Sequence, residues 1–377
     1  MQREGLLTRR ERAGTEEERR GYGPRTAVVK RTSMVDEAQA RADETGRVIV
    51  IHNGASWGAN GGGQRPEQIA RALESEACVI HIHGCNPNRI QRPVTETVVA
   101  SMGRFAGWLE IEAESRVLYT SFPEPRIWAE LGEVDLRDWT LWYDCIDGWA
   151  DFDTGDWYSE MREANIVRRA DLVTATARSL VERMEAIGAD APVHFLPNST
   201  LLLDQPVPDI GAEPECDVIF VGCMSGEWID WDLIERIAWQ GYTVWLIGDP
   251  PKNGKPVRAD NVEWVGRVDN AELRQWLAAA RVGIVPFLDR PLVHDVWPIK
   301  YADYLAAGIP TVAAHLPEIQ DAPFCAVTWS DDDFMAALDR AVRTDWPREE
   351  IMREAEAHTA AARVAQAGEW LAEVGAW

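Results

Sequence analysis

The sequence predicts an α/β protein made of two doubly wound parallel sheets, and three features support this fold class. From Arg47 onward, short apolar runs alternate with amphipathic stretches, the pattern of parallel strands covered by helices on both faces. Residues 204–215, which contain three prolines and no strand pattern, interrupt this alternation. The alternation restarts at Cys216, so we predict two consecutive domains of one type.

Apolar runs of strand length and stretches with helical period define the expected elements. The first half predicts strands at 47–52, 77–83, 116–120, 139–144, 171–175 and 193–196, and helices at 65–75, 94–107 and 157–169. The second half predicts strands at 216–221, 242–247, 261–265, 281–286, 309–314 and 325–329, then helices at 332–343 and 347–374. These elements give a first domain over 46–205, a second over 216–345 and a C-terminal helix over 346–377. Residues 1–45 are polar and lack a stable period, so we expect a flexible tail or a short helix there.

Composition excludes several functional classes. The net charge of −24 repels polyanions, so a nucleic-acid partner is disfavoured. No apolar run reaches the roughly 18–20 residues of a membrane span, and the amino end lacks an apolar signal core. The six cysteines form no Cys-x-x-Cys pair. We therefore expect a cytoplasmic protein with no transmembrane segment and at most a weak membrane association through its basic tail.

The segment 295–310, DVWPIKYADYLAAGIP, is the most informative part of the sequence. Pro298 stands where a helix would begin, and Gly308 followed by Pro310 marks its end. The free N–H groups of a helix amino terminus suit an anion such as a diphosphate. We therefore predict a helix of about three turns with an anion site at its start.

Three charged residues of this segment are candidate ligand contacts. Asp295 and Asp303 are separated by seven residues, and carboxylates are natural acceptors for sugar and ribose hydroxyls. Lys300 lies in the first helical turn of a chain that otherwise prefers arginine, which favours a phosphate contact over a plain surface lysine.

Glycine-rich loops follow several of the predicted strands. Gly222 and Gly248 each end a strand of the second domain, where glycine would let the backbone approach a diphosphate. Two doubly wound domains offer a cleft between them, and Gly62 lies in a loop of the first domain that leads into a helix and that we expect to face this cleft. Arg267 follows another strand and is a weaker candidate for a ligand contact.

The segment YDCIDGW at 143–149 places acidic and aromatic residues after a strand of the first domain. Carboxylates accept hydroxyl hydrogen bonds or a proton, and aromatic faces stack on sugar rings. Asp147 is the leading candidate for a base or an acceptor-orienting acid, and His83, at the end of another strand, is the rival. The alternative for Asp147 is an acidic surface loop with a helix cap.

The stretch PIKYADYLAAGIP resembles the GT-B glycosyltransferases, in particular the family-4-like sugar transferases of group 1. Their hallmark is a Glu-(seven residues)-Glu segment that runs into P-x-K-x-x-E-Y-L-A-A-G-x-P, and YDCIDGW is similar to a Y-D-x-x-D-x-W stretch of some members. The resemblance implies an acceptor-side first domain and a donor-binding second domain facing a cleft, with the last helix crossing back. It also implies that Asp303 holds the donor ribose and Asp295 the transferred sugar, although both are Asp where the family has Glu.

The implied activity is transfer of a hexose or related sugar from a UDP- or GDP-sugar to the hydroxyl of a glycan, glycolipid or small molecule. The paired acids favour retention of configuration. We expect no cofactor and no metal, and Asp331–Asp333 should cap a helix rather than bind a cation. Two alternatives stay open: a nucleotide-sugar epimerase on the same fold, and a non-catalytic module that binds a sugar nucleotide.

Overall fold

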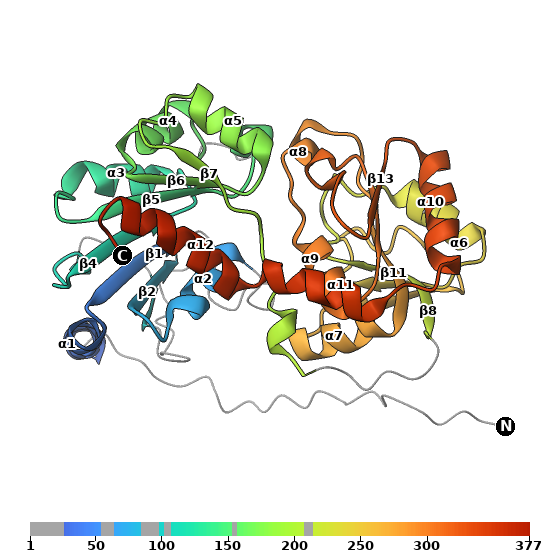
Figure 1. The fold of residues 1–377 in the computed structure, drawn as a ribbon, viewed down its shortest axis with the longest axis horizontal. Coiled ribbons are helices and arrows are strands. Elements are labelled where there is room, and N and C mark those ends of the chain that lie inside the picture. Colours follow the sequence, from blue (N-terminus) through green and yellow to red (C-terminus); the bar gives the residue numbers. More distant parts are fainter. Residues whose placement is uncertain (1–25, 54–63, 84–97, 102–106, 153–156, 207–213) are drawn as a thin grey trace.

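The computed structural model contains two α/β domains that lie side by side (Figure 1). It describes residues 26–53, 64–83, 98–101, 107–152, 157–206 and 214–377, and of residues 26–34, 53, 83, 98–101 and 126 it describes the backbone alone.

The first domain contains a seven-stranded parallel sheet in the order β3-β2-β1-β4-β5-β6-β7, which confirms the predicted fold class. Its strands are β1 (Arg47–Asn53), β2 (Cys78–His83), β3 (Val98–Ser101), β4 (Ser115–Thr120), β5 (Thr140–Cys145), β6 (Leu172–Ala175) and β7 (Val193–Phe195). The helix expected over 94–107 is wrong, because 98–101 pair with β2 as the edge strand β3. β-Branched valines at 98 and 99 fit this strand.

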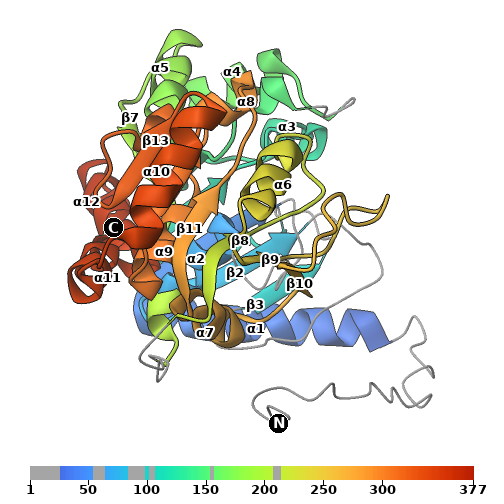
Figure 2. The same ribbon diagram turned by 90° about the vertical axis from the view of Figure 1, so that its right-hand side faces the viewer.

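The helices of the first domain lie against both faces of its sheet. They are α1 (Thr26–Thr45), α2 (Arg65–Leu73), α3 (Pro125–Glu133), α4 (Glu160–Arg169) and α5 (Arg178–Ala186). Of the flexible tail or short helix expected over 1–45, residues 26–45 form a helix, α1, which is longer than expected, and 1–25 lie outside the described residues. Helix α1 lies along the lower edge of the view in Figure 2 and packs on β1 and β2. Ala38 and Ala42 are fully buried there, and this burial fixes the helix.

The second domain repeats the plan with a six-stranded parallel sheet in the order β10-β9-β8-β11-β12-β13. Its strands are β8 (Cys216–Val221), β9 (Val244–Ile247), β10 (Val262–Gly266), β11 (Ala280–Val285), β12 (Thr311–Ala314) and β13 (Cys325–Thr328). Its helices are α6 (Trp231–Trp239), α7 (Asn270–Ala278), α8 (Pro291–His294), α9 (Ile299–Ala307) and α10 (Asp331–Arg343). Ser330, rather than the aspartates after it, is the N-cap of α10, and Asp331–Asp333 form its first turn.

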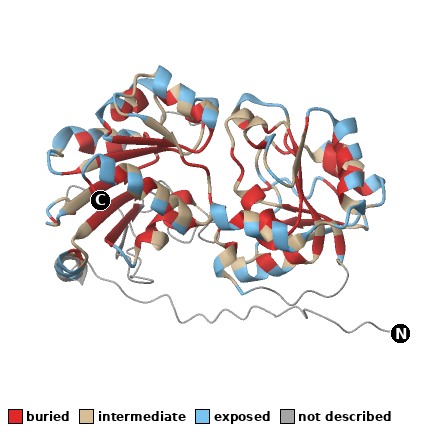
Figure 3. Cartoon of the chain, in the orientation of Figure 1, coloured by how far each residue is buried: buried red, intermediate tan, exposed pale blue. Residues whose placement is uncertain are grey.

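Burial follows the parallel-sheet pattern in both domains: the central strands are buried, the edge strands β7, β10 and β13 are partly exposed, and the outer helix faces are exposed (Figure 3). In β1 every apolar residue from Val48 to Ile51 is fully buried. No helix in the described ranges is long and apolar enough to cross a membrane.

The C-terminal segment crosses from the second domain back to the first. The single helix expected over 347–374 is wrong, because the chain forms α11 (Arg348–Ala355), a 3₁₀ turn (Glu356–His358) and α12 (Ala360–Glu373). Thr359 caps α12, and a β-bridge pairs Thr359 with Thr200 at the crossing. Val364, Ala367 and Leu371 of α12 then join the core of the first domain.

Candidate active site

Helix α9 begins and ends where the sequence predicts. Pro298 is its N-cap residue, and Gly308 ends it in the left-handed conformation with a φ of 73°. Gly308 and Ile309 donate their backbone N–H groups to the carbonyls of Leu305 and Tyr304, which closes the last turn. Within the described structure no side chain caps the first turn. Tyr301 donates its backbone N–H to the carbonyl of Pro298. The N–H groups of Ile299 and Lys300, in contrast, have no acceptor among the described residues and are available to an anion.

Lys300, Gly222 and Gly248 come together at the ends of β8 and β9. A Cβ atom added to Gly222 would lie 2.5 Å from Lys300 Cε and 3.0 Å from Nζ, so the lysine side chain lies directly over the Gly222 backbone. A Cβ atom added to Gly248 would overlap the carbonyl oxygen of Gly222. Only glycine permits this packing, and it brings together three residues predicted for the diphosphate.

The Lys300 ammonium makes no ion pair within 4 Å among the residues that the structure describes. Its Nζ lies 5.7 Å from the ring centre of Phe287. Burial lowers the pKa of Lys300, while Asp303, Cys223 and Asp147 act in the opposite direction. Among the described residues, the Lys300 amino group therefore has no carboxylate in direct contact.

Asp303 lies on the same helix as Lys300, next to the segment that joins the two domains. Thr200 Oγ1 donates a hydrogen bond of 2.7 Å to Asp303 Oδ1. Burial raises the pKa of Asp303 to about 6, against the opposing effects of the Thr200 hydrogen bond and the Lys300 charge. The carboxyl group is therefore mostly ionised at neutral pH.

Asp295 reaches across to the first domain. A Cβ atom added to Gly148 would lie 2.7 Å from Asp295 Oδ2, so the carboxyl group lies against the backbone beside Asp147. Burial raises the pKa of Asp295, and Asp151 raises it further. Burial also raises the pKa of Asp147, to about 7, although the Lys300 charge acts to lower it. Asp295 of the second domain thus lies against the backbone of the residue after Asp147, and Asp147 is poised to exchange a proton near pH 7.

Three other candidates are not part of this cluster as described. Arg267 forms an ion pair of 2.8 Å with Asp249, and both side chains are exposed. His83 ends β2, but its side chain lies outside the described residues, as does Gly62 entirely.

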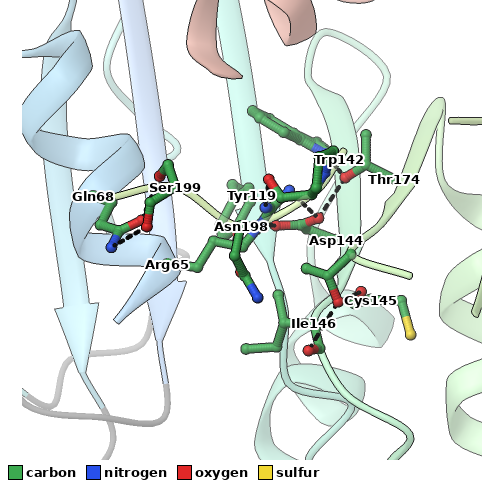
Figure 4. A network of polar contacts seen from close by, with 12 residues as sticks. Arg65, Gln68, Tyr119, Trp142, Asp144, Cys145, Ile146, Thr174, Asn198 and Ser199 are labelled. Carbon is green, nitrogen blue, oxygen red and sulfur yellow. Dashed lines mark hydrogen bonds and ion pairs between the residues drawn. The ribbon is translucent and has the colours of Figure 1, made fainter. Parts of the chain in front are cut away.

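A buried polar network supports the carboxyl edge of the first sheet, and sequence reasoning missed it (Figure 4). The Asp144 carboxylate is fully buried and accepts hydrogen bonds from Arg65 at 2.5 and 3.1 Å. Tyr119 and Thr174 donate to it at 2.7 and 2.6 Å. Arg65 also donates to the backbone carbonyl of Pro197 at 3.0 Å. Hydrogen-bond donors therefore surround the Asp144 carboxylate, which fits a structural role. Through the bond from Arg65 to Pro197, the network also fixes the segment after β7 by which the chain leaves the first domain.

His52 is a second buried polar residue that the sequence did not single out. It lies near the end of β1, with Nε2 2.9 Å from a Glu124 carboxylate oxygen and Nδ1 3.2 Å from the Thr120 hydroxyl. Both ring nitrogens face these partners and the ring is buried, so the residue links β1, β4 and the start of α3.

Glu318 forms a contact between the domains that local sequence patterns did not reveal. Its carboxylate accepts the backbone N–H groups of Arg178 at 2.8 Å and Ser179 at 3.0 Å, in the first turn of α5. The N-cap residue of α5, Ala177, offers no side-chain acceptor, so the second domain supplies the cap. Elsewhere at the interface the rings of Phe152 and Trp228 are 6.3 Å apart.

A pocket of about 440 Å³ opens beside this contact. Its lining comes from both domains: Arg178, Ser179, Glu182, His294, Pro317, Glu318 and Trp329. The size lies within the ~300–1,000 Å³ of typical ligand pockets. Trp329 is 52% exposed and offers an aromatic face.

Comparison with known proteins gives a family match within the second domain. Residues 215–343 match the family described as glycosyl transferases group 1. A protein of Bacillus subtilis (strain 168), assigned as the teichuronic acid biosynthesis glycosyltransferase TuaH, is 28% identical over 200 residues. The alignment covers 46% of this chain and 50% of that protein, so the chain spans about half the length of this relative.

Solved structures share the fold over most of the chain. Sucrose-phosphate synthase from Thermosynechococcus elongatus has a TM-score of 0.64 at 14% identity, covering 88% of this chain and 99% of that chain. Anabaena HepE, solved in complex with UDP, has a TM-score of 0.65 at 13% identity, covering 87% of this chain and 100% of that chain. At these identities the likeness establishes the fold alone, and the family match adds the sequence relationship. The second domain therefore matches the group 1 glycosyltransferases in sequence, and the chain as a whole has the two-domain GT-B fold.

Proposed function

We propose that this protein transfers a sugar from a nucleoside diphosphate sugar to a hydroxyl acceptor. The observation that carries the proposal is the Lys300 ammonium, which lies over Gly222 without a contacting carboxylate in the described structure. We call the backbone at Gly222 and Gly248 beneath Lys300 the glycine cradle. An anion bound there would be attracted by the Lys300 ammonium group, would accept hydrogen bonds from the free N–H groups at the start of α9, and could approach the backbone closely. A diphosphate matches all three features.

The donor would lie along the carboxyl edge of the second sheet, where ligands of doubly wound domains bind. Lys300 and the start of α9 would hold the diphosphate, Asp303 would accept a ribose hydroxyl, and Asp295 would face the transferred sugar. Arg267 remains a candidate contact with the nucleobase. It is exposed, and binding the nucleobase would require it to break its ion pair with Asp249. The complex of HepE with UDP supports a uridine nucleotide as the first donor to test.

Transfer requires stabilisation of the departing diphosphate, which gains charge as the bond to the sugar breaks. Lys300 and the backbone N–H groups of α9 would supply this stabilisation from preorganised positions. Asp147, with its pKa raised to about 7, would accept the proton of the acceptor hydroxyl or orient that hydroxyl. His83 remains the rival for this role. We propose retention of configuration because of the paired acids, and NMR of the anomeric proton of the product tests it.

The acceptor would approach from the first domain. Asp147 and Asp151 make the described part of this side acidic, which favours a neutral or cationic acceptor over a polyanion. The pocket beside Asp295 has room for a sugar ring against Trp329. The name of the Bacillus subtilis relative supports a glycan as the acceptor.

A turnover screen tests the proposal. UDP-glucose, UDP-galactose, UDP-N-acetylglucosamine and GDP-mannose are incubated with and without simple glycoside acceptors, and released nucleotide and sugar products are measured. Acceptor-dependent release of UDP or GDP supports a transferase. Interconversion of donor sugars without acceptor indicates an epimerase, and nucleotide binding without turnover indicates a binding module; either outcome contradicts the proposal.

We further propose that the reaction needs no metal or cofactor. The described residues contain no group of three or more side chains arranged to hold a metal ion. Activity that is unchanged by excess EDTA would support this, and loss of activity restored by Mg²⁺ or Mn²⁺ would contradict it. The described cysteines are free thiols, as expected in the cytoplasm, the location that we propose.

A further inference from the structure

Thr200 lies at the point where the chain leaves the first domain. Its backbone N–H donates to the carbonyl of His358 at 2.8 Å, and it pairs with Thr359 in a β-bridge. Only 1% of the residue is exposed. Thr200 is therefore fixed to the crossing segment that connects α11 with α12, and it is not part of the helix that carries the candidate donor contacts.

The hydrogen bonds of the Thr200 hydroxyl fix its orientation. The backbone N–H of Leu202 donates to Thr200 Oγ1 at 3.0 Å, so that oxygen already acts as an acceptor. Its own proton then points to Asp303 Oδ1, 2.7 Å away. Asp303 Oδ2 has no hydrogen bond to any described residue. One carboxylate oxygen is thus held in place while the other stays available.

We propose that Thr200 is a positioning residue for nucleotide binding: its hydroxyl holds Asp303 Oδ1 so that Oδ2 accepts a ribose hydroxyl of the donor. The inference rests on the proposed function, because it assumes that Asp303 contacts ribose. An aspartate side chain has few rotamers and a short reach, so its direction depends strongly on such a partner. The connection to His358 and Thr359 also means that the domain crossing sets the direction of this acid.

The surroundings of Asp303 give this arrangement a pH signature. Among the described residues, Lys300 on the same helix is the charged group that acts electrostatically on Asp303. Tyr304, the residue after Asp303, is uncharged and donates a hydrogen bond to the backbone carbonyl of Ile284. The Thr200 hydrogen bond and the Lys300 charge both lower the pKa of Asp303, which burial raises to about 6. Removal of the hydroxyl therefore raises this pKa further and reduces the ionised fraction near neutral pH.

The test is calorimetric titration of UDP and GDP into the full chain between pH 5.5 and 8. We compare wild type with Thr200→Val, which keeps the shape and removes the hydroxyl, and with Thr200→Ser, which keeps the hydroxyl. At pH 7 Thr200→Val should weaken the better nucleotide about 5- to 10-fold, the loss of one hydrogen bond to a charged group. The pH at which affinity is half-maximal should rise, and Thr200→Ser should stay within about 2-fold of wild type.

Two further measurements separate positioning from a structural effect. The 2′,3′-dideoxy form of the same nucleotide should bind wild type and Thr200→Val almost equally, because it has no ribose hydroxyl for Asp303. Thr328→Val removes another buried hydroxyl of the second domain, which donates to Ala313, and should leave nucleotide affinity unchanged. If Thr200→Val does not fold, Thr200→Ala is measured in the same way.

The failures of the inference and of the proposed function are distinguishable. If Asp303→Asn weakens UDP and GDP binding but Thr200→Val shows the wild-type affinity and pH profile, the positioning role is wrong and the ribose contact stands. If Asp303→Asn binds both nucleotides as wild type does, the ribose contact itself is wrong.

Discussion

Glu318 of the second domain caps a helix of the first, with its carboxylate 2.8 Å from the backbone nitrogen of Arg178. A second bond, to the N–H of Ser179, and burial of the Glu318 side chain strengthen the contact. An acceptor at a helix amino terminus stabilises the helix typically by about 1 kcal/mol. Because the two partners belong to different domains, this stabilisation exists only while the domains are closed on each other.

Replacement of this cap should therefore favour the open form. We expect Glu318→Ala to weaken UDP or GDP binding about 5-fold, because closure then costs more, and to increase the radius of gyration in X-ray scattering without ligand. Glu185→Ala, an exposed change on the same helix α5, is the matched control. An unchanged scattering profile together with wild-type affinity would show that the contact does not control closure.

Gly222→Ala tests the cradle beneath Lys300. The added Cβ would meet Lys300 Cε at 2.5 Å, and a φ of 153° already disfavours a side chain there. We expect nucleotide affinity to fall at least 10-fold as the lysine is displaced. Gly241→Ala, with a φ of 93° and nothing within 4 Å of the new atom, introduces backbone strain without a collision. Equal losses in both variants would assign the effect to strain rather than to Lys300.

Asp147→Asn should abolish a pH dependence that wild type shows. The pKa of about 7 predicts that wild-type kcat/KM rises as the pH increases through 7, because the base must be deprotonated. The variant should be slow and should lose the rise near pH 7, keeping only the change near pH 6 that comes from Asp303. Asp151→Asn, an exposed change four residues along the chain, should keep the wild-type profile. A wild-type profile in Asp147→Asn would exclude this residue as the base.

The same residue should affect stability in a defined direction. The folded-state pKa of Asp147 lies above the unfolded value, so its contribution to stability is fully present below about pH 4 and is lost as the pH rises through 7. Asparagine cannot ionise, so the Tm of Asp147→Asn relative to wild type should increase from pH 4 to pH 7.5. Differential scanning calorimetry measures this difference. A difference that stays constant or falls with pH would contradict the raised pKa.

Asp144→Asn should destabilise the first domain strongly. It removes the charge opposite Arg65, and breaking a buried ion pair costs about 3–5 kcal/mol. Urea unfolding followed by circular dichroism should show an earlier transition for one domain, with the other unchanged. Asp135→Asn breaks an exposed pair with Arg137 and should have little effect. Similar midpoints for both variants would mean that the Asp144 network is not a main source of stability.

Local signals in the sequence were enough to predict most of the fold and part of the site. Pro298 and Gly308 bound α9 because each acts on its own stretch of backbone. The apolar runs predicted the remaining strands, but the edge strand at 98–101 was assigned to a helix. An edge strand pairs on one side only, and a short apolar run there does not distinguish the two structures.

The contacts between distant residues could not be predicted in this way. Glu318 meets Arg178 across 140 residues, and Thr200 meets Asp303 across 103. Neither pair has a local pattern, because their geometry depends on how the two domains dock. The sequence could place Asp147 and Asp295 at the ends of their own elements, but only the docked domains bring Asp295 against Gly148.

The central claim is that Lys300 and the glycine cradle bind the diphosphate of a sugar nucleotide. Calorimetric titration of UDP and GDP into Lys300→Gln and wild type at pH 7 tests it most directly, with Lys252→Gln, an exposed lysine, as control. We predict that Lys300→Gln binds the better nucleotide about 10- to 100-fold more weakly, the loss of a charge-assisted phosphate contact. Lys252→Gln should bind as wild type does. Equal affinity of wild type and Lys300→Gln for both nucleotides would contradict the claim.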